Sequence, residues 1–288
     1  RDLDLLLVDL VDVGARYYTY AATAVWAAEA ALAAGCEVWV LDRPNPLGGA
    51  AIEGNLRPPG FESFVGAFAL PVRHGLTLGE LALLEAARRG WSEGLEVVEV
   101  RNWRRHETWH GIGRPWLAPS PNLPTLAAAW VYPGLCLIEG TTLSEGRGTT
   151  RPFQLVGAPG VDPPALAAAI VHPGIVAVPA YFRPQFHKHA GELCGGVLLE
   201  VVAPPAVQPV RLGVEVLSAF ARLAPEAFGW REEVYEFASE RPAIDLLSGG
   251  ETLRRTIDDG GDLGPWLGSW RNDEERFRAE RAAILLYD

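Results

Sequence analysis

The sequence predicts an α/β fold: a doubly wound, mainly parallel sheet followed by a smaller α+β domain. Two observations support this prediction. In the first half of the 288 residues, short apolar runs typical of buried strands alternate with helix-like segments, as in strand–helix–strand units of parallel sheets. In the second half, predicted helices dominate and the strand candidates are fewer. The chain is long enough to bury a substantial core.

The first two predicted strands are Leu3–Leu10 and Cys36–Asp42, because both are almost continuous apolar runs bounded by aspartate. The segment between them, Tyr17–Ala34, is rich in alanine and ends before Gly35, a residue that commonly terminates helices. These three elements form the first predicted strand–helix–strand unit.

A second helix is predicted at Thr77–Arg89, where Thr77 and Glu80 have the spacing of a capping box. A third strand is predicted at Leu95–Val100. The segment Ala127–Glu139 predicts a short helix followed by a strand over the letters LCLIE.

In the second half, the pattern predicts four helices and two strands. The helices are Pro163–Val171, Leu212–Leu223, Gly250–Asp258 and Asp273–Leu285, and the strands lie near Ile175–Val178 and Gly196–Val202. We place the domain boundary near Arg151–Gly160, which gives domains of residues 1–152 and 153–288.

The composition excludes several classes of function. The formal net charge is −11, and no basic stripe is present, so the sequence argues against nucleic acid as a partner. The three cysteines lack metal-ligand spacing, and no apolar stretch is long enough to span a membrane. Because the chain opens on Arg1 within a strand-like run, we expect it to be a piece of a longer protein, and its localisation cannot be predicted from these features.

Four polar loops follow predicted strands or precede helices. They are Asp9–Tyr20, Leu41–Gly49, Arg73–Glu80 and Glu139–Phe153. Parallel sheets bind ligands in the loops at the carboxyl ends of their strands, so these loops are the candidate site.

Individual residues of these loops also have structural explanations. Asp12 is a possible cap of the following helix, and Asp42 with Arg43 a possible ion pair that braces a turn. His74 is equally well explained as an ordinary turn histidine, and Glu80 as the partner of a capping box. The sequence leaves these alternatives open.

The loop Glu139–Phe153 has three competing explanations: a solvated surface loop, a phosphate cradle, or a site where carboxylates act. The spacing of Gly140 and Gly146 is one residue longer than in a P-loop, Arg147 replaces its lysine, and the G-x-G-x-x-G fingerprint is absent. A nucleotide-dependent sugar enzyme therefore has little support.

The same loop is suited to an anionic ligand other than a nucleotide. Arg147 lies between glycines and hydroxyl side chains, and Glu139 and Glu145 are close to it in sequence. An arginine that binds an anion beside two carboxylates fits hydrolysis of an acidic sugar better than phosphoryl transfer.

Six segments together resemble a known family. In chain order they read DVGARYYTY, VLDRPNPLGG, RHGLTLGELA, PSPNLPTL, YPGLCLIEGTTLSEGRGTTRPFQLVGAP and KHAGELCGGV. They resemble the bacterial family DUF1343, described as exo-β-N-acetylmuramidases that cleave terminal N-acetylmuramic acid from peptidoglycan fragments. The resemblance implies a Rossmann-like N-terminal domain, a cleft between the domains, no nucleotide cofactor, and a secreted or periplasmic bacterial protein.

Two features depart from the family pattern. Family members carry an N-terminal portion with a proline–acid–histidine–glycine stretch, a strong candidate for a catalytic carboxylate, and this chain starts after it. Val11 stands where the family usually has glutamine before the aspartate. A non-catalytic muropeptide-binding module, or an inactive fragment of such an enzyme, is therefore the alternative to an active glycoside hydrolase.

The resemblance and the polar loops together give a set of predicted site residues. Glu139 is the first candidate for a catalytic carboxylate, followed by Asp12 and Glu145, and Arg147 is predicted to bind the lactyl carboxylate of muramic acid. The other predicted substrate-binding residues are Arg16, Tyr20, Asp42, Arg43, Asn45, His74, Ser120, Asn122, Thr141 and Ser144. We predict no cofactor and no metal site, and a muramic-acid glycan as the partner.

Overall fold

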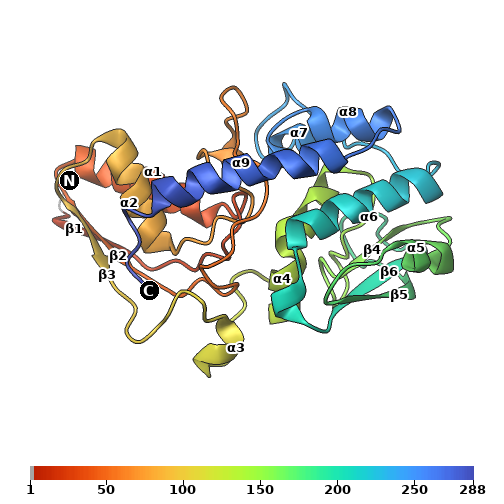
Figure 1. Cartoon of the computed structure of the whole chain (residues 1–288), viewed down its shortest axis with the longest axis horizontal. Helices are drawn as coiled ribbons and strands as arrows, with labels where there is room; N and C mark the ends of the chain where they lie inside the picture. Colours follow the sequence, from red (N-terminus) through yellow and green to blue (C-terminus); the bar gives the residue numbers. More distant parts are fainter. Residues whose placement is uncertain (1–2) are drawn as a thin grey trace.

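The computed structural model describes residues 3–288 and contains two sheets, each with its own helices (Figure 1). The elements of the first part are β1 (Leu5–Val8), α1 (Tyr20–Ala33), β2 (Glu37–Leu41), η1 (Phe64–Gly66), α2 (Leu78–Arg89), β3 (Leu95–Val98) and α3 (Trp109–Ile112). Those of the second part are α4 (Leu126–Leu135), η2 (Cys136–Gly140), β4 (Leu155–Ala158), α5 (Pro163–Ala169), β5 (Ile175–Phe182), β6 (Cys194–Val201), η3 (Pro204–Ala206), α6 (Pro209–Leu223), α7 (Ala243–Ser248), α8 (Thr252–Asp258) and α9 (Gly264–Arg281).

The first sheet has the parallel order β1-β2-β3. Helices α1 and α2 pack against it and against each other, so that Val8, Val38 and Val40 share a core with apolar residues of both helices. The predicted capping box starts α2: the Thr77 side chain accepts a hydrogen bond from the backbone N–H of Glu80, and the Glu80 carboxylate accepts one from that of Thr77. The predicted α/β class of this part is confirmed.

The second sheet is antiparallel, with the order β4-β6-β5. β6 lies in the middle and pairs with β5 along its whole length, from Cys194 opposite Phe182 to Val201 opposite Ile175. Helix α5 packs on β5 and β6, while α4 and α6 pack against each other beside this sheet. β4 and α7 were not predicted from the sequence, because both are short segments without a clear apolar period.

The strand predicted over the letters LCLIE is wrong. Residues Cys136–Gly140 form the 3-10 helix η2, which continues α4. Cys136, Leu137 and Ile138 are all buried, so this apolar run faces protein on every side. A uniformly buried run shows neither the period of a strand nor that of a helix, and for that reason the pattern could not distinguish the two.

Helix α9 joins the two parts of the molecule. It extends across both in Figure 1, and its side chains enter both cores: Trp270 packs with the second part and Phe277 with the first. The predicted helix Asp273–Leu285 covers only its later turns, because the helix begins at Gly264. No helix within residues 3–288 has the length and apolarity needed to cross a lipid bilayer.

Two glycines allow α4 and α6 to approach each other closely. A Cβ atom built on Gly213 would lie 2.2 Å from the carbonyl oxygen of Gly134, and one built on Gly134 would lie 1.7 Å from that of Pro209. The obstructing atoms belong to the backbone, so no side-chain rotation can relieve such a clash. This contact orients η2, which extends directly from α4.

We therefore expect Gly213→Ala to lower the free energy of unfolding by about 1–3 kcal/mol, in spite of alanine's better helix propensity. The measurement is chemical denaturation. Gly268→Ala is the matched control, because Gly268 lies inside α9 and its Cβ would meet nothing within 4 Å. We expect the control to be stabilised by about 0.5–1 kcal/mol. Equal stability of the two variants would contradict the close-contact explanation.

Candidate functional site

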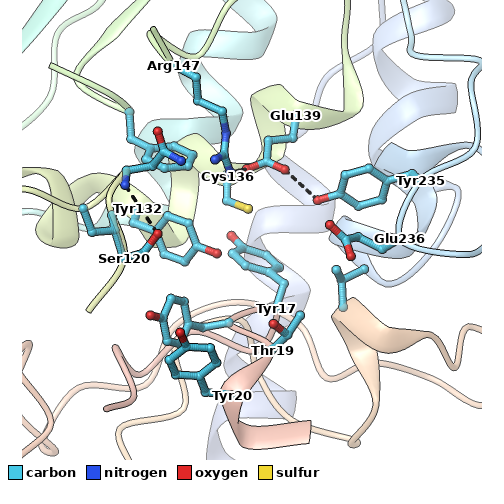
Figure 2. A pocket seen from close by; sticks show the side chains of 15 residues that line it. Tyr17, Thr19, Tyr20, Ser120, Tyr132, Cys136, Glu139, Arg147, Tyr235 and Glu236 are labelled. Carbon is cyan, nitrogen blue, oxygen red and sulfur yellow. Dashed lines mark hydrogen bonds and ion pairs between the residues drawn. The ribbon is translucent and has the colours of Figure 1, made fainter. Parts of the chain in front are cut away.

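A pocket lies where the two parts of the molecule meet. Residues from the start of α1, from the loop before α4, from α4 and η2, and from the loops at 147–153 and 235–236 line it (Figure 2). The lining residues are Tyr17, Tyr18, Thr19, Tyr20, Val65, Ser120, Asn122, Leu123, Tyr132, Cys136, Glu139, Arg147, Phe153, Tyr235 and Glu236. Five of the predicted site residues are therefore brought together: Tyr20, Ser120, Asn122, Glu139 and Arg147.

Glu139 is held on the floor of this pocket by two donors. Nη2 of Arg147 donates a 2.6 Å hydrogen bond to one carboxylate oxygen, and the hydroxyl of Tyr235 donates a 2.8 Å bond to the other (Figure 2). Glu139 is 8% exposed, so its carboxylate is nearly enclosed but still borders the pocket. Charge-assisted hydrogen bonds of this kind fix the orientation of a carboxylate.

Arg147 is shared between two carboxylates and an aromatic ring. Its Nε lies 3.2 Å from Oε1 of Glu145, and its guanidinium carbon lies 5.2 Å from the centre of the Phe153 ring. Burial lowers the pKa of Arg147, but the ion pairs with Glu139 and Glu145 outweigh burial and raise the net pKa above its usual value. Within residues 3–288, Nη1 makes no hydrogen bond, so its two N–H groups are available to a ligand.

Tyrosine hydroxyls form much of the pocket wall. Burial, together with neighbouring carboxyl and thiol groups, raises the pKa of Tyr17, Tyr132 and Tyr235 well above the ordinary value. These phenols therefore stay protonated at neutral pH. The pocket lining thus combines neutral phenols with the carboxylates of Glu139 and Glu236 and the guanidinium of Arg147.

Lys188, the only lysine of the chain, lies behind the pocket and fixes the loop that carries its charges. Its Nζ donates hydrogen bonds of 3.0 Å to the carbonyl oxygens of Ile138 and Leu143 and to the carboxylate of Glu145. Glu145 is fully buried, so this ammonium compensates a carboxylate that water cannot reach. The segment around Lys188 is strained, since His187 and His189 both have positive φ, 72° and 56°.

The hydroxyls of the same loop serve its own backbone. Oγ1 of Thr141 donates to the carbonyl of Ile138, and Oγ of Ser144 accepts from the N–H of Gly146. Thr141, Ser144 and Glu145 do not line the pocket. Their predicted contacts with substrate stay predictions, and the structure places them in the layer that supports Glu139 and Arg147.

Asp12 and His74 come together, but in a second cluster away from the pocket lining. Both are buried, and Nε2 of His74 lies 3.7 Å from Oδ2 of Asp12. Asp12 does not cap α1, whose N-cap residue is Thr19; its carboxylate accepts from the N–H of Gly14 instead. Burial raises the pKa of Asp12 to about 7 and lowers that of His74 to about 3, so both side chains are uncharged between these two pH values.

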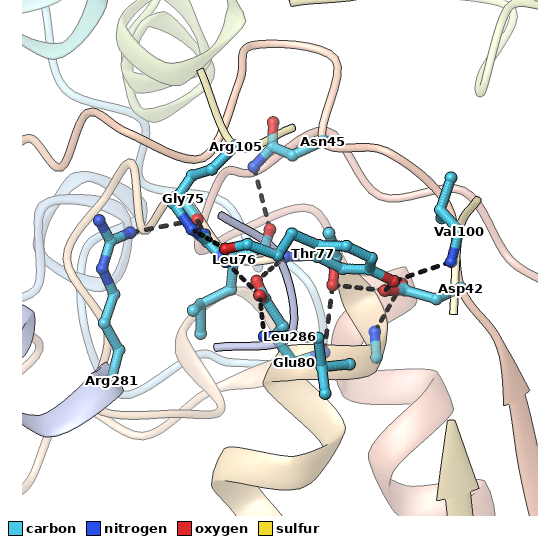
Figure 3. A network of polar contacts seen from close by, with 12 residues as sticks. Asp42, Asn45, Gly75, Leu76, Thr77, Glu80, Val100, Arg105, Arg281 and Leu286 are labelled. Carbon is cyan, nitrogen blue, oxygen red and sulfur yellow. Dashed lines mark hydrogen bonds and ion pairs between the residues drawn. The ribbon is translucent and has the colours of Figure 1, made fainter. Parts of the chain in front are cut away.

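Asp42 and Asn45 belong to the network around the start of α2 (Figure 3), and the backbone N–H of Arg43 donates to the carboxylate of Asp42. Asp42 accepts hydrogen bonds from the Thr77 hydroxyl and from the N–H of Gly79, at the first turn of the helix. The guanidinium of Arg43 pairs at the surface with Asp9 rather than with Asp42. The amide of Asn45 donates to the carbonyl of Leu76.

Arg16 is a buried structural contact between the two parts. Its guanidinium donates to the carbonyl oxygens of Asn55, Leu70 and Leu247, the last of which lies in α7. Burial lowers the pKa of Arg16 to about 10. Its predicted role in substrate binding is not tested by these contacts, which occupy Nη1 and Nη2.

Comparisons with known proteins assign the chain to a family. A family model described as the N-terminal part of the exo-β-N-acetylmuramidase NamZ matches residues 1–127, and a model of its C-terminal part matches residues 130–287. The chain belongs to the NamZ exo-β-N-acetylmuramidase family. The two matches meet within α4, whereas the boundary predicted from the sequence lies at 152/153 and stays a prediction.

Relatives within the NamZ family match over the full chain. The peptidoglycan β-N-acetylmuramidase NamZ of Bacillus subtilis strain 168 is 39% identical over 290 residues, which span 100% of this chain and 68% of the relative. A DUF1343 crystal structure from Bacteroides fragilis superposes with a TM-score of 0.89 at 31% identity, covering 100% of this chain and 76% of the other. A second protein of that organism gives a TM-score of 0.74 at 30% identity, covering 99% and 76%.

Sequence reasoning missed several residues of the NamZ-family pocket. The tyrosines Tyr17, Tyr18 and Tyr132 were not selected, although the run YYTY before α1 is an unusual aromatic signal. Tyr235 and Glu236 gave no signal at all, since their segment has neither glycine nor a period that marks it. Only the fold brings that segment to Glu139, almost a hundred residues earlier in the chain.

No group of three or more histidine, cysteine, aspartate or glutamate side chains within the described part of the chain has a geometry that could hold a metal ion. The cysteines Cys36, Cys136 and Cys194 are free thiols. The pocket lining offers two carboxylates, one guanidinium, phenols, two aliphatic hydroxyls, one thiol and one amide; besides the tyrosines these belong to Glu139, Glu236, Arg147, Thr19, Ser120, Cys136 and Asn122.

We expect stability to depend on pH through Asp12. Because burial raises its pKa from 3.8 to about 7, the folded state holds an additional proton between these values, and this contribution to stability is lost as the pH rises through about 7. Asp12→Asn removes the titration. From pH 5 to pH 8, the parent should lose more free energy of unfolding than the variant does. We expect the difference between the two losses to be on the order of 2 kcal/mol.

Chemical denaturation at the two pH values measures this difference. Asp9→Asn is the control, because Asp9 is half exposed in a surface ion pair with Arg43. The control should follow the parent at both pH values. Parallel curves for the parent and Asp12→Asn would contradict a buried, proton-bearing Asp12.

Proposed function

We propose that this chain is a glycoside hydrolase that releases terminal N-acetylmuramic acid from peptidoglycan fragments, with the sugar bound in the pocket at Glu139. The observation that carries the proposal is the joint presence of Glu139, Arg147 and Tyr235 on the pocket floor of a NamZ-family chain. A relative from Bacillus subtilis is named a peptidoglycan β-N-acetylmuramidase and supports this substrate class.

Glu139 is proposed as a carboxylate that acts on the bound sugar. Hydrolysis of a glycosidic bond passes through an oxocarbenium-like transition state, which an oriented carboxylate stabilises as positive charge develops at the ring. The hydrogen bonds from Arg147 and Tyr235 hold Glu139 before substrate arrives, so little reorganisation is needed. Glu145 acts only through Arg147, because it is fully buried and paired with Lys188.

Arg147 is proposed to recognise the lactyl group that distinguishes muramic acid from glucosamine. Its Nη1 has no partner within residues 3–288, and a ligand carboxylate can accept from it. The lining Ser120 and Asn122 supply further polar groups for the ring hydroxyls and the acetamido group. A glucosamine ligand would fill the same space without using the free guanidinium N–H.

We further propose that the protein acts on peptidoglycan fragments in the bacterial envelope or outside the cell. Support comes from the bacterial source of the relatives and from the word peptidoglycan in the name of the Bacillus subtilis protein. We also propose that hydrolysis there proceeds without a nucleotide, because the chain has neither the P-loop spacing nor the G-x-G-x-x-G fingerprint.

The proposal is tested by comparing chromogenic β-glycosides of N-acetylmuramic acid and N-acetylglucosamine as substrates. We expect the parent to prefer the muramic acid glycoside, and Arg147→Lys to lower the ratio of the two kcat/KM values about 10-fold, because lysine cannot keep the Glu139 pair and also offer a free planar donor. The ratio cancels any general loss of active protein. Unchanged selectivity in the variant would contradict the role of Arg147.

For Glu139 we expect Glu139→Gln to reduce kcat on the muramic acid glycoside about 100-fold or more, with a smaller change in KM. Steady-state kinetics provides the measurement, and thermal unfolding verifies that the variant is folded. Glu93→Gln, a change at an exposed glutamate between α2 and β3, serves as the control and should leave kcat unchanged. A Glu139→Gln variant with the parent's kcat would remove Glu139 from the mechanism.

A non-catalytic muropeptide-binding module is the second candidate, favoured by the complete engagement of Glu139 with two donors. In that case calorimetry would show the parent binding N-acetylmuramic acid, while the chromogenic glycosides would not be hydrolysed.

A further inference from the structure

An exposed row of aromatic rings lies next to the pocket. Trp26 of α1 stacks on Phe64 with ring centres 5.6 Å apart, and Phe64 meets Phe237 edge-on at 6.1 Å. Phe237 is 90% exposed and Trp26 is 42% exposed. We name these three residues the aromatic ledge. Single exposed phenylalanines are common on protein surfaces and need no explanation. A continuous row of exposed aromatic rings beside a pocket is instead typical of an interaction site.

The aromatic ledge is continuous with the mouth of the pocket. Tyr20 and Glu236 are the exposed members of the pocket lining, whereas its floor is buried. Phe237 follows Glu236 directly, and Phe64 precedes Val65, another lining residue. Tyr20 and Trp26 are both exposed residues of α1, six residues apart, which corresponds to about 9 Å along the helix axis.

The backbone that presents Phe237 is held in an unfavourable conformation. Tyr235 and Ala238 exchange two backbone hydrogen bonds of 3.1 and 2.9 Å, and the two residues between them both have positive φ, 44° for Glu236 and 68° for Phe237. Turns of this kind normally contain asparagine or glycine at these positions, because other side chains are strained there. The turn directs Tyr235 and Glu236 to the pocket while Phe237 stays in solvent.

From these observations we propose that the aromatic ledge binds the second sugar ring of the glycan, the neutral N-acetylhexosamine joined to the muramic acid in the pocket. This inference rests on the proposed function of the pocket. The C–H groups of a pyranose face pack on the negative face of an aromatic ring, and the exposed rings of Trp26 and Phe237 are free for such contact. When the terminal sugar of a glycan occupies the pocket, the rest of the glycan has to extend out through the mouth of the pocket.

The charge around the aromatic ledge favours a neutral ring over an acidic peptide. The segment 231–241 around this turn carries four glutamates, Glu232, Glu233, Glu236 and Glu240, against two arginines, Arg231 and Arg241, which leaves a net negative charge. An anionic stem peptide placed there would meet like charges, whereas an uncharged sugar would not. The ledge therefore selects for the glycan strand rather than for its peptide substituent.

Calorimetry with two ligands tests the proposal: N-acetylmuramic acid alone, and a disaccharide in which it is β-linked through sulfur to N-acetylglucosamine, so that the bond is not hydrolysed. We expect the parent to bind the disaccharide more tightly than the single sugar. Phe237→Ala and Trp26→Ala should each weaken disaccharide binding about 3- to 10-fold and leave monosaccharide binding unchanged.

Two further variants complete the design. Phe237→Trp should retain the tighter binding of the disaccharide, because it restores an aromatic face, and Tyr181→Ala removes an equally exposed ring on β5 and should behave as the parent. If the parent binds both ligands equally, or if the ledge variants weaken both ligands alike, the ledge proposal is wrong while the proposed function stands. Failure of the parent to bind either ligand overturns the proposed function and the ledge together.

Discussion

The arrangement of the pocket depends on one ammonium group. Lys188 bridges the carbonyl ends of η2 and the following loop to the buried carboxylate of Glu145. Glu145 in turn lies beside the guanidinium of Arg147, and Arg147 holds Glu139. Each of these charges is largely removed from water, so each needs its partner, and loss of one member would leave an uncompensated charge in the interior. The strained segment on both sides of Lys188 is retained because this chain of charges requires the ammonium at that place.

The pocket combines elements that are distant in the sequence, and the close approach of α4 and α6 sets its geometry. Gly134 and Gly213 allow the two helices to touch, and η2 then leaves α4 in the direction that places Glu139 on the pocket floor. α9 contributes to both cores, so the walls of the pocket, which come from different parts, are tied by one helix (Figure 1). Rigid walls are needed where a sugar ring has to be oriented to within a fraction of an ångström.

Local signals in the sequence predicted the strand–helix–strand order, the capping box of α2 and the association of Glu139 with Arg147, because each depends on residues close together in the chain. Contacts made by the fold could not be predicted in this way. The pairing of Tyr235 with Glu139 joins residues far apart, and nothing near Tyr235 marks it. Asp12 was predicted as a catalytic candidate and His74 as a substrate-binding residue, and the fold buries the two side chains together outside the pocket lining. The polarity of a residue in the sequence does not distinguish a buried polar pair from a residue that lines a pocket. The strand prediction for the LCLIE segment was wrong because complete burial removes the hydrophobic periodicity on which such a prediction relies.

The position of Lys188 also makes it a chemical reporter of folding. Reagents that acylate primary amines of side chains have one target in this chain, and its nitrogen is occupied by two carbonyl oxygens and a carboxylate. Acylation at that atom requires the loop from Ile138 to Glu145 to open. Mass spectrometry can monitor the rate of acylation at this single lysine. That rate would measure how often the loop that carries the charges of the pocket opens, and no probe has to be introduced.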